Sequence, residues 1–216
     1  MTVTLAVDTS TDVRAGVARD GVVLASGAVA DPRAHAEQLM PLVSRILAEA
    51  GVSLGDVDEL VAGVGPGPFT GLRVGVVTAT TLGLALGRPV KGVCSLDAVA
   101  RQWSDAGAPG RFAVVSDARR KEVYWAVYDE GVRVEGPFVA APAEVPDLPL
   151  AGPGASLVRP EVTGPTILDA GALAARASVL PDAGLEPLYL RRPDAALPSA
   201  PKTTIPQPRI ALRRAR

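Results

Sequence analysis

The chain has 216 residues, 48% of them hydrophobic, which is enough for a sizeable core in one or two domains. Its 22 basic residues nearly balance 23 acidic ones, so no overall positive field would hold a nucleic acid, and any such contact must be local or made through a partner. A single cysteine, Cys94, and a single histidine, His35, exclude an intrachain disulfide and a zinc site built from several Cys and His ligands.

Two features bear on where the chain resides. The N-terminal stretch MTVTLAVDTSTD has no basic region ahead of a long apolar run, so we expect no signal peptide. The longest apolar run, VGVVTATTLGLALG, has 14 residues with three threonines, fewer than the ~20 residues that span a membrane. We therefore expect a soluble, cytoplasmic protein with no membrane contact.

The first segment shows the alternation of β-structure. TVTLAVD ends at Asp8, a polar turn follows, and RAGVA and VVLASG flank a second turn at Arg19-Asp20-Gly21. This pattern predicts three antiparallel strands in a meander.

A helical period replaces the alternation after Pro32 and stops at Gly51. Pro41 lies within it, so we expect a kink or a start later than His35. The apolar stripe of this helix consists of Leu39, Leu42, Val43, Ile46 and Leu47.

The next segments complete a first α/β unit. VDELVAGVG predicts a buried strand, and a glycine-rich loop leads into a helix over residues 70–86. PVKGV predicts a short strand, and a helix opened by Ser95 ends the unit near residue 105. Strands connected by crossover helices are typical of α/β architecture.

A second unit repeats the plan of the first. FAVVSDARRKEVYWAVYDEGVRVEG again runs strand, Asp-led turn, strand, glycine turn, strand, and Asp117 to Gly131 spans 14 positions where Asp8 to Gly21 spans 13. Any two meanders look alike, so duplication and coincidence both remain open on pattern alone. With duplication, the chain has two related lobes, residues 1–105 and a smaller 106–192.

The remaining segments are less regular. From about Glu135 frequent prolines predict loops with short strands at best, followed by one helix over LDAGALAARASVL. Residues 193–216 carry several prolines and four arginines among the last eight residues. We expect this basic tail to be disordered.

The glycine-rich loop GVGPGPFTGLRVG, Gly63 to Gly75, invites comparison with phosphate-binding loops. It lacks the lysine of a Walker A loop, and it has one residue too many before the third glycine of a dinucleotide fingerprint. Pro66 and Pro68 also remove two backbone donors that would face a phosphate. The loop is therefore not expected to hold a nucleotide.

The helix after this loop carries small residues every four positions, at Gly71, Gly75, Ala79 and Gly83. Such a stripe allows close approach of another element. The residues alone favour packing on the chain's own sheet. The other interpretation is an interface with a second chain, shared with the apolar stripe of the preceding helix.

The opening turn, Asp8-Thr9-Ser10, resembles the phosphate-binding turn of actin-like and sugar-kinase-like ATPases, but it lacks the glycine that lets the backbone close on phosphate. It is either a degenerate remnant of that turn or a plain Asx turn. No local motif marks a nucleophile for His35, and Cys94 at a strand end is expected to be a packing residue.

The charged second turn includes Asp117, Arg119, Arg120 and Lys121. A solvated hairpin tip is the first interpretation of this turn, and contact with a partner is the second.

Five stretches in order resemble the TsaB (YeaZ) family of bacterial proteins: LAVDTSTDVRAGVA, HAEQLMPLVSRIL, VDELVAGVGPGPFTGLRVGVVTATTLGLALGRPVKGVCSLDAVA, SDARRKEVYWAVYD and PLYLRR. The resemblance covers about residues 3 to 192, and GPGPFTGLRVG is its most specific part. It implies a two-lobed actin-like ATPase fold (ASKHA, ribonuclease H-like) with a duplicated three-strand meander, in a member without catalytic activity, metal or cofactor.

The resemblance also implies a function. The family acts in tRNA threonylcarbamoyladenosine (t6A) synthesis, in which a threonylcarbamoyl group is transferred to N6 of adenosine 37 in tRNAs reading ANN codons. Its members bind the catalytic paralogue TsaD, are joined by the ATPase subunit TsaE, meet tRNA only through the complex, and form homodimers alone. An independent actin-like ATPase or small-molecule kinase using Asp8 and Asp117 is the alternative.

Carried onto this sequence, the family's partner interface falls on the first two helices, and Asp8, Thr9 and Ser10 become a remnant phosphate turn. The resemblance thus favours the interface interpretation of the glycine stripe. The interface residues implied are Leu39, Leu42, Val43, Ile46, Leu47, Gly71, Arg73, Gly75, Ala79 and Gly83.

Overall fold

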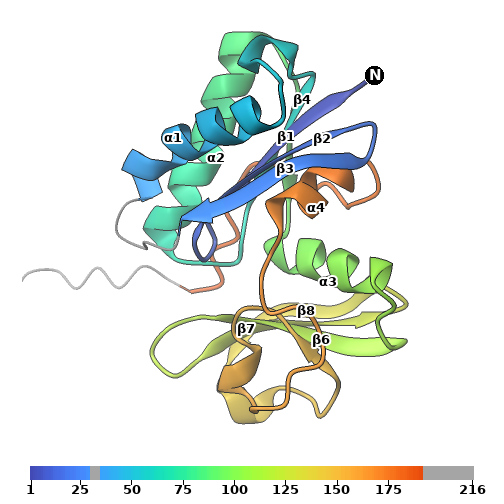
Figure 1. Ribbon diagram of the computed structural model, residues 1–216. Coiled ribbons are helices and arrows are strands. Elements are labelled where there is room, and N and C mark those ends of the chain that lie inside the picture. The colour runs from blue at the N-terminus through green and yellow to red at the C-terminus, as the bar shows by residue number, and fades with distance from the viewer. Residues whose placement is uncertain (30–34, 192–216) are drawn as a thin grey trace, which may run out of the picture.

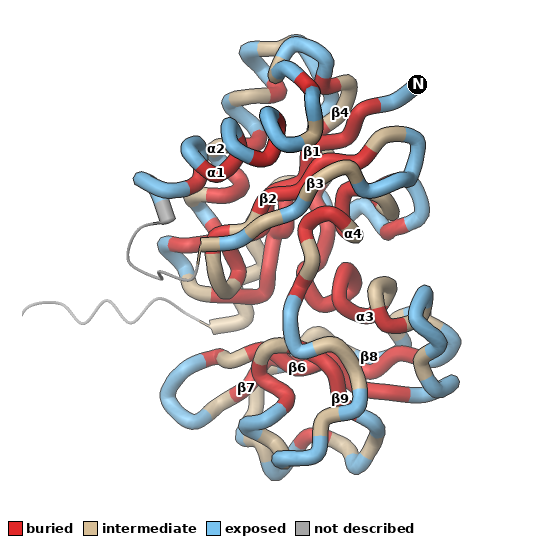
Figure 2. The backbone as a smooth tube through the Cα atoms, viewed as in Figure 1, coloured by how far each residue is buried: buried red, intermediate tan, exposed pale blue. Residues whose placement is uncertain are grey.

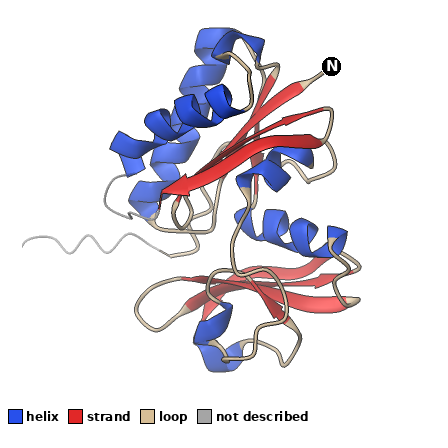
Figure 3. Ribbon diagram, in the orientation of Figure 1, coloured by secondary structure: helices blue, strands red, loops and turns tan. Residues whose placement is uncertain are grey.

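The structure is a computed structural model that describes residues 1–29 and 35–191 (Figure 1). The basic tail predicted to be disordered lies outside these residues. Within them the chain forms two mixed β-sheets with helices packed on and between them (Figure 3).

The first sheet contains the predicted opening meander and has the strand order β3-β2-β1-β4-β5. β1 pairs antiparallel with β2 and parallel with β4, and its side chains are buried along its whole length. The strands are β1 (Val3–Asp8), β2 (Val13–Arg19), β3 (Val22–Val29), β4 (Glu59–Gly63) and β5 (Val90–Val93).

The second sheet repeats this pairing in the order β8-β7-β6-β9, with β6 antiparallel to β7 and parallel to β9. The repeat confirms two parts of the predicted fold class, the α/β architecture and the duplicated meander. β8 runs on to Ala140, so regular structure persists further than the prolines from Glu135 predicted. The strands are β6 (Arg111–Asp117), β7 (Val123–Asp129), β8 (Val132–Ala140) and β9 (Leu150–Ala151).

Four α-helices accompany the sheets in the described residues. α1 starts at His35 and runs through Pro41, so the expected later start is wrong. α2 ends at Leu86 and is capped by Gly87, whose backbone is left-handed. The helices are α1 (His35–Glu49), α2 (Phe69–Leu86), α3 (Ser95–Asp105) and α4 (Ala170–Ala175), with 3-10 turns η1 (Leu54–Asp56), η2 (Pro142–Glu144) and η3 (Ala155–Leu157).

Both faces of the first sheet are covered. α1 and α2 lie on one face, and α4 lies on the other, against β2 and β3 (Figure 1). α4 approaches so closely that a Cβ added to Gly16 would lie 2.2 Å from the backbone nitrogen of Gly171. The apolar stripe of α1 packs into the core beneath β1 and β2, as its 3.6-residue period requires.

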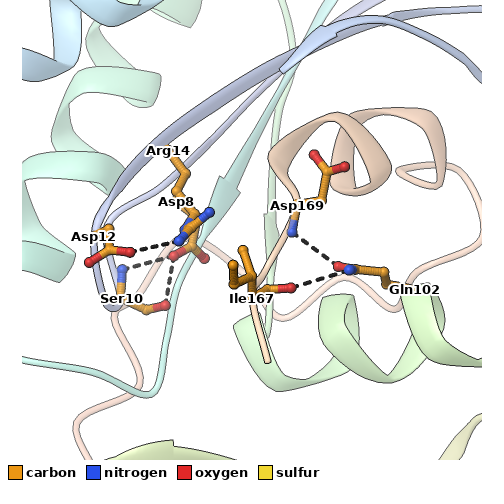
Figure 4. Close-up of polar contacts among 7 residues, drawn as sticks. All are labelled: Asp8, Ser10, Asp12, Arg14, Gln102, Ile167 and Asp169. Atoms are coloured by element: carbon orange, nitrogen blue, oxygen red, sulfur yellow. Dashed lines mark hydrogen bonds and ion pairs between the residues drawn. The ribbon is translucent and has the colours of Figure 1, made fainter. Parts of the chain in front are cut away.

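α3 and α4 each pack on the sheet of the other lobe. α3, which the sequence placed in the first lobe, packs on the second sheet, whereas α4 from the second lobe packs on the first. Gln102 of α3 accepts a hydrogen bond from the Asp169 backbone and donates one to the Ile167 carbonyl, which joins the helices (Figure 4). A boundary at residue 105 therefore does not separate the two sheets together with the helices that pack on them.

One buried cluster spans both lobes. It joins Ala6 and Val61 of the first sheet to Trp103 of α3 and to Phe112 and Tyr128 of the second sheet. Figure 2 shows buried stretches of backbone in both sheets and in α3 and α4 between them. Because apolar side chains are continuous across the junction, separating the lobes would expose core surface to water.

α2 is the helix in the described part of the chain that is long and apolar enough to cross a membrane by length and composition. The helix has 18 residues because it begins before Arg73, ahead of the apolar run of 14 residues. One side of the helix packs against the first sheet, with Leu72 and Val76 buried. The other side of the helix is exposed, and 33% of the apolar window is buried within the chain.

Candidate functional site

The opening turn follows β1 and turns its polar groups inward. Asp8 Oδ1 accepts hydrogen bonds from the backbone N–H of Ser10 (2.8 Å) and from the Ser10 hydroxyl (2.6 Å), as in an Asx turn (Figure 4). The other carboxylate oxygen, Oδ2, accepts from the Ser95 hydroxyl of α3 at 2.5 Å. Both oxygens of the carboxylate are thus bonded within the chain.

Asp8 is fully buried beside β4. A Cβ added to Gly63 would lie 1.7 Å from Asp8 Oδ2, so glycine is required for the carboxylate to fit. Burial raises the pKa of Asp8, although its hydrogen bonds from Ser10 and Ser95 favour the ionised form. A carboxylate satisfied in this way does not fit the role of a metal ligand at a phosphate.

Asp8→Asn is expected to flatten the dependence of stability on pH. Because the pKa of Asp8 is higher folded than unfolded, the native chain binds more protons, and its free energy of unfolding falls as pH rises above about 4. The variant lacks this group, so its stability relative to the wild type should improve from pH 4 to pH 7. Urea denaturation at both values checks this, and parallel pH profiles of the two proteins would contradict it.

The glycine-rich loop packs directly on this turn. Gly65 exchanges hydrogen bonds with Ser95, donating to its hydroxyl at 3.1 Å and accepting from its backbone N–H at 2.7 Å. A Cβ added to Gly67 would lie 2.6 Å from the carbonyl oxygen of Ser10. The glycines therefore serve close contact between the loop and the opening turn.

A pocket of about 270 Å³ lies where the opening turns of the two lobes meet. Asp12 and Asp117 line it, and each is ion-paired to a nearby arginine, Arg14 at 2.6 Å and Arg119 at 3.2 Å. Because each arginine is neutralised by one aspartate, these four side chains carry no net positive charge that would attract a polyphosphate.

The second turn forms the exposed tip of the β6–β7 hairpin. Arg119, Arg120 and Lys121 are exposed and all adopt left-handed backbone conformations, with φ of 64°, 54° and 63°. The first interpretation of this turn, a solvated hairpin tip, agrees with these exposures.

The interface residues implied by the family resemblance lie mostly inside the chain. Only Arg73 is exposed, and the other nine are buried in the described structure. This corrects the expectation that these side chains form an outer surface. The buried residues are Leu39, Leu42, Val43, Ile46, Leu47, Gly71, Gly75, Ala79 and Gly83.

The glycine stripe of α2 faces the first sheet. A Cβ added to Gly83 would lie 2.2 Å from Val90 Cγ2 of β5, and one at Gly75 would lie 2.3 Å from Thr9 Oγ1. The Thr9 hydroxyl donates to the Gly71 carbonyl at 2.7 Å and accepts from the Gly75 N–H at 3.1 Å. It therefore bridges two groups that bond each other in a regular helix.

The opposite face of α2 exposes apolar side chains that the sequence analysis did not single out. Val77 is 60% exposed, Leu84 is 85% exposed and Phe69 is 37% exposed, while Met40 of the adjacent α1 is 37% exposed. With the stripe facing inward, positions 73, 77 and 84 necessarily face outward, and this helical spacing is the signal that could have found them. A partner interface on α1 and α2 remains a prediction, and these outward faces would form it.

Cys94 precedes α3 and is completely buried, as expected of a packing residue. Burial raises the pKa of its thiol to about 12. His35 is the first residue of α1. Among the described residues no three Cys, His, Asp or Glu side chains are placed to hold a metal ion, and the expected absence of a metal stays a prediction.

Cys94 is expected to resist alkylation in the folded chain. At pH 8 a thiol with a pKa of about 12 is ionised in roughly one molecule in 10⁴, and only the thiolate is nucleophilic. Modification by iodoacetamide should be at least ~100-fold slower than in urea. Mass spectrometry over time measures both rates, and equal rates would show that the thiol is accessible.

Comparison with known proteins places this geometry in a family. A family model described as "TsaD: tRNA N6-adenosine threonylcarbamoyltransferase" matches residues 29–159. An uncharacterized protein of Mycobacterium tuberculosis is 48% identical over 200 residues, covering 88% of this chain and 92% of that protein. The Escherichia coli protein TsaB is 40% identical over 126 residues, covering 57% of this chain and 54% of its own length.

Solved structures agree with these sequence matches. A Pseudomonas aeruginosa crystal structure titled as similar to peptidase YeaZ has a TM-score of 0.74 and 31% identity, and covers 88% of this chain and 100% of its own. A second structure, YeaZ from the same organism, has a TM-score of 0.70 and 30% identity over the same shares. The chain therefore belongs to the family described as tRNA N6-adenosine threonylcarbamoyltransferase (TsaD), and within this family to the TsaB/YeaZ proteins.

Proposed function

We propose that this chain is a non-catalytic scaffold subunit that enables threonylcarbamoyl transfer to N6 of adenosine 37 in tRNAs reading ANN codons. The observation that carries the proposal is that the carboxylate of the opening turn is already fully hydrogen-bonded within the chain. Both oxygens of Asp8 are bonded to Ser10 and Ser95, and the carboxylate is fully buried. An actin-like fold without an available acid at this turn is suited to binding a partner rather than to phosphoryl transfer.

The partner would be the catalytic paralogue TsaD, bound through the outward faces of α1 and α2. Val77 and Leu84 expose apolar surface there, and burying such side chains is the main favourable term in association. In this proposal TsaE joins the pair, and tRNA binds to the complex rather than to this chain alone. In the absence of TsaD the chain forms a homodimer through the same surface. All of these contacts take place in the cytoplasm.

Reconstitution in vitro tests this function. Labelled threonine is incorporated into tRNA by TsaD, the adenylate-forming enzyme and TsaE of the same organism, with and without this chain. Incorporation that depends on the chain and survives Asp8→Asn supports a scaffold. Equal incorporation without the chain would refute the proposal.

The alternative, an independent ATPase or kinase, predicts nucleotide binding by the isolated chain. A ligand that binds only the folded state raises the melting temperature as its concentration exceeds Kd. Millimolar ATP with magnesium should leave the melting temperature unchanged if the chain is a scaffold. A clear rise that Asp8→Asn abolishes would favour the enzyme.

A further inference from the structure

Arg73 lies one turn into α2, on the exposed side of the helix, where it stacks on the ring of Phe69 and is hydrogen-bonded to Tyr189. Its guanidinium carbon lies 3.8 Å from the centroid of the Phe69 ring and 5.9 Å from that of the Tyr189 ring. Its Nε–H donates a hydrogen bond to the Tyr189 hydroxyl at 3.0 Å. The rings themselves contact each other, with centroids 4.7 Å apart. We call Phe69, Arg73 and Tyr189 the arginine clamp.

The clamp is assembled from distant parts of the chain. Phe69 and Arg73 are four residues apart on α2 and therefore share a face. Tyr189 belongs to the segment that returns to the first lobe after α4, where the backbone N–H of Ala183 donates to Gly92 and that of Leu188 to Val64, both at 2.8 Å. Arg191 of the same segment is ion-paired to Glu122. Anchoring on both sides fixes the ring of Tyr189 before any partner arrives.

This arrangement leaves part of the guanidinium available. Nε is bonded to Tyr189, while Nη1 and Nη2 have no carboxylate at ion-pairing distance among the described residues. Most other arginines in that part of the chain do pair with a carboxylate, as Arg14 and Arg88 do. An arginine fork with free terminal nitrogens matches the two oxygens of a carboxylate.

Stacking also lowers the cost of binding. A free arginine side chain loses considerable rotamer freedom when it is fixed in an interface, and a side chain already held by stacking on Phe69 and by a hydrogen bond to Tyr189 loses less. The clamp adjoins exposed apolar surface, because Val77 follows Arg73 by one turn on the same face of α2. It therefore lies within the surface proposed above for the partner.

We infer that Arg73 takes an aspartate or glutamate side chain of the catalytic paralogue through Nη1 and Nη2, with Phe69 and Tyr189 fixing its orientation. The inference rests on the proposed function and adds the chemistry of the contact. A protein carboxylate is favoured over a nucleic acid phosphate because the clamp is a single cation bordered by apolar side chains. A phosphate-binding surface requires several basic groups along a backbone.

The test compares affinities for purified TsaD. Arg73→Lys keeps the charge but loses the fork, and Arg73→Met keeps an apolar stem over Phe69. We expect Kd to rise about tenfold for lysine and at least about tenfold for methionine. Arg111→Met on the second lobe, whose partner Glu135 lies in the same chain, is the matched control and should leave Kd unchanged. Unaltered melting temperatures would show that the fold is intact.

Charge reversal identifies the partner group. Arg73→Glu should weaken binding about 100-fold, and one acid-to-lysine substitution in the contacting surface of TsaD should restore it. Wild-type affinity in Arg73→Glu, with binding still lost when Val77 and Leu84 become aspartate, would overturn the inference and leave the scaffold intact. Loss of tRNA affinity of the complex at unchanged TsaD affinity would assign a phosphate instead. Failure of the wild-type chain to bind TsaD would overturn both proposals.

Discussion

The double substitution Val77→Asp and Leu84→Asp is expected to weaken binding to TsaD at least about 100-fold and to abolish threonine incorporation. Each apolar side chain contributes ~1.5 to 3 kcal/mol when it is fully buried. An aspartate in the same place must also lose its hydration without a matched cation. Because Val77 and Leu84 are 60% and 85% exposed in the isolated chain, the substitutions should leave its stability nearly unchanged.

The measurement is titration calorimetry of the variant with purified TsaD, alongside the reconstituted reaction. Val132→Asp with Val134→Asp is a matched control, since these residues of β8 are 67% and 50% exposed on the other lobe. The control should bind and support incorporation like the wild type. Wild-type Kd in the α2 variant would show that the outward face of α2 is not the interface.

The order and type of most elements were predictable from local pattern. Alternation predicted both meanders, and the helical period predicted α1, α2 and a last helix that in the structure is shorter, α4. The similar spacings of Asp8 to Gly21 and of Asp117 to Gly131 fitted a duplicated meander but left coincidence open, and the pairing of the strands in the two sheets decides for the repeat.

It was less predictable which neighbour the small residues of α2 pack against. Small residues at every fourth position allow close approach to any neighbour, whether a sheet of the same chain or a helix of another. The contact between Gly75 and Thr9 decides between them, and it joins residues 66 positions apart. No local pattern in the sequence carries that information.

Ser95 illustrates the same limit. The sequence predicted it as the start of a helix, yet its hydroxyl bonds to Asp8, 87 positions away. The exchange of α3 and α4 between the lobes is likewise a tertiary outcome, since sequence order placed each helix with its nearest strands. Tyr189, in the arginine clamp, has no periodic signal and is positioned by backbone bonds of its segment to β4 and β5 neighbours.

Gly75→Ala is expected to destabilise the chain by about 2 to 4 kcal/mol. Alanine favours a helix over glycine by ~1 kcal/mol, but its Cβ would lie 2.3 Å from Thr9 Oγ1. Relief requires the Thr9 hydroxyl to leave both Gly71 and Gly75, which loses two buried hydrogen bonds of about 1 kcal/mol each and strains the packing by a further ~1 to 3 kcal/mol. The cost of the clash therefore exceeds the gain in helix propensity.

A double-mutant cycle identifies this cause. Thr9→Ala removes the hydroxyl and lets the N–H of residue 75 bond the Gly71 carbonyl directly, so Gly75→Ala should cost little or even stabilise in that background. Gly55→Ala is the control, because the nearest atom to its added Cβ is 3.8 Å away. Urea denaturation gives the four free energies of unfolding. If Gly75→Ala lowers the free energy of unfolding equally with and without the Thr9 hydroxyl, contact with Thr9 is not the reason why α2 requires a small residue at this position. A partner packing on it would instead make Gly75→Ala harmless to the isolated chain and harmful to TsaD binding, whereas the contact with Thr9 predicts loss of stability first.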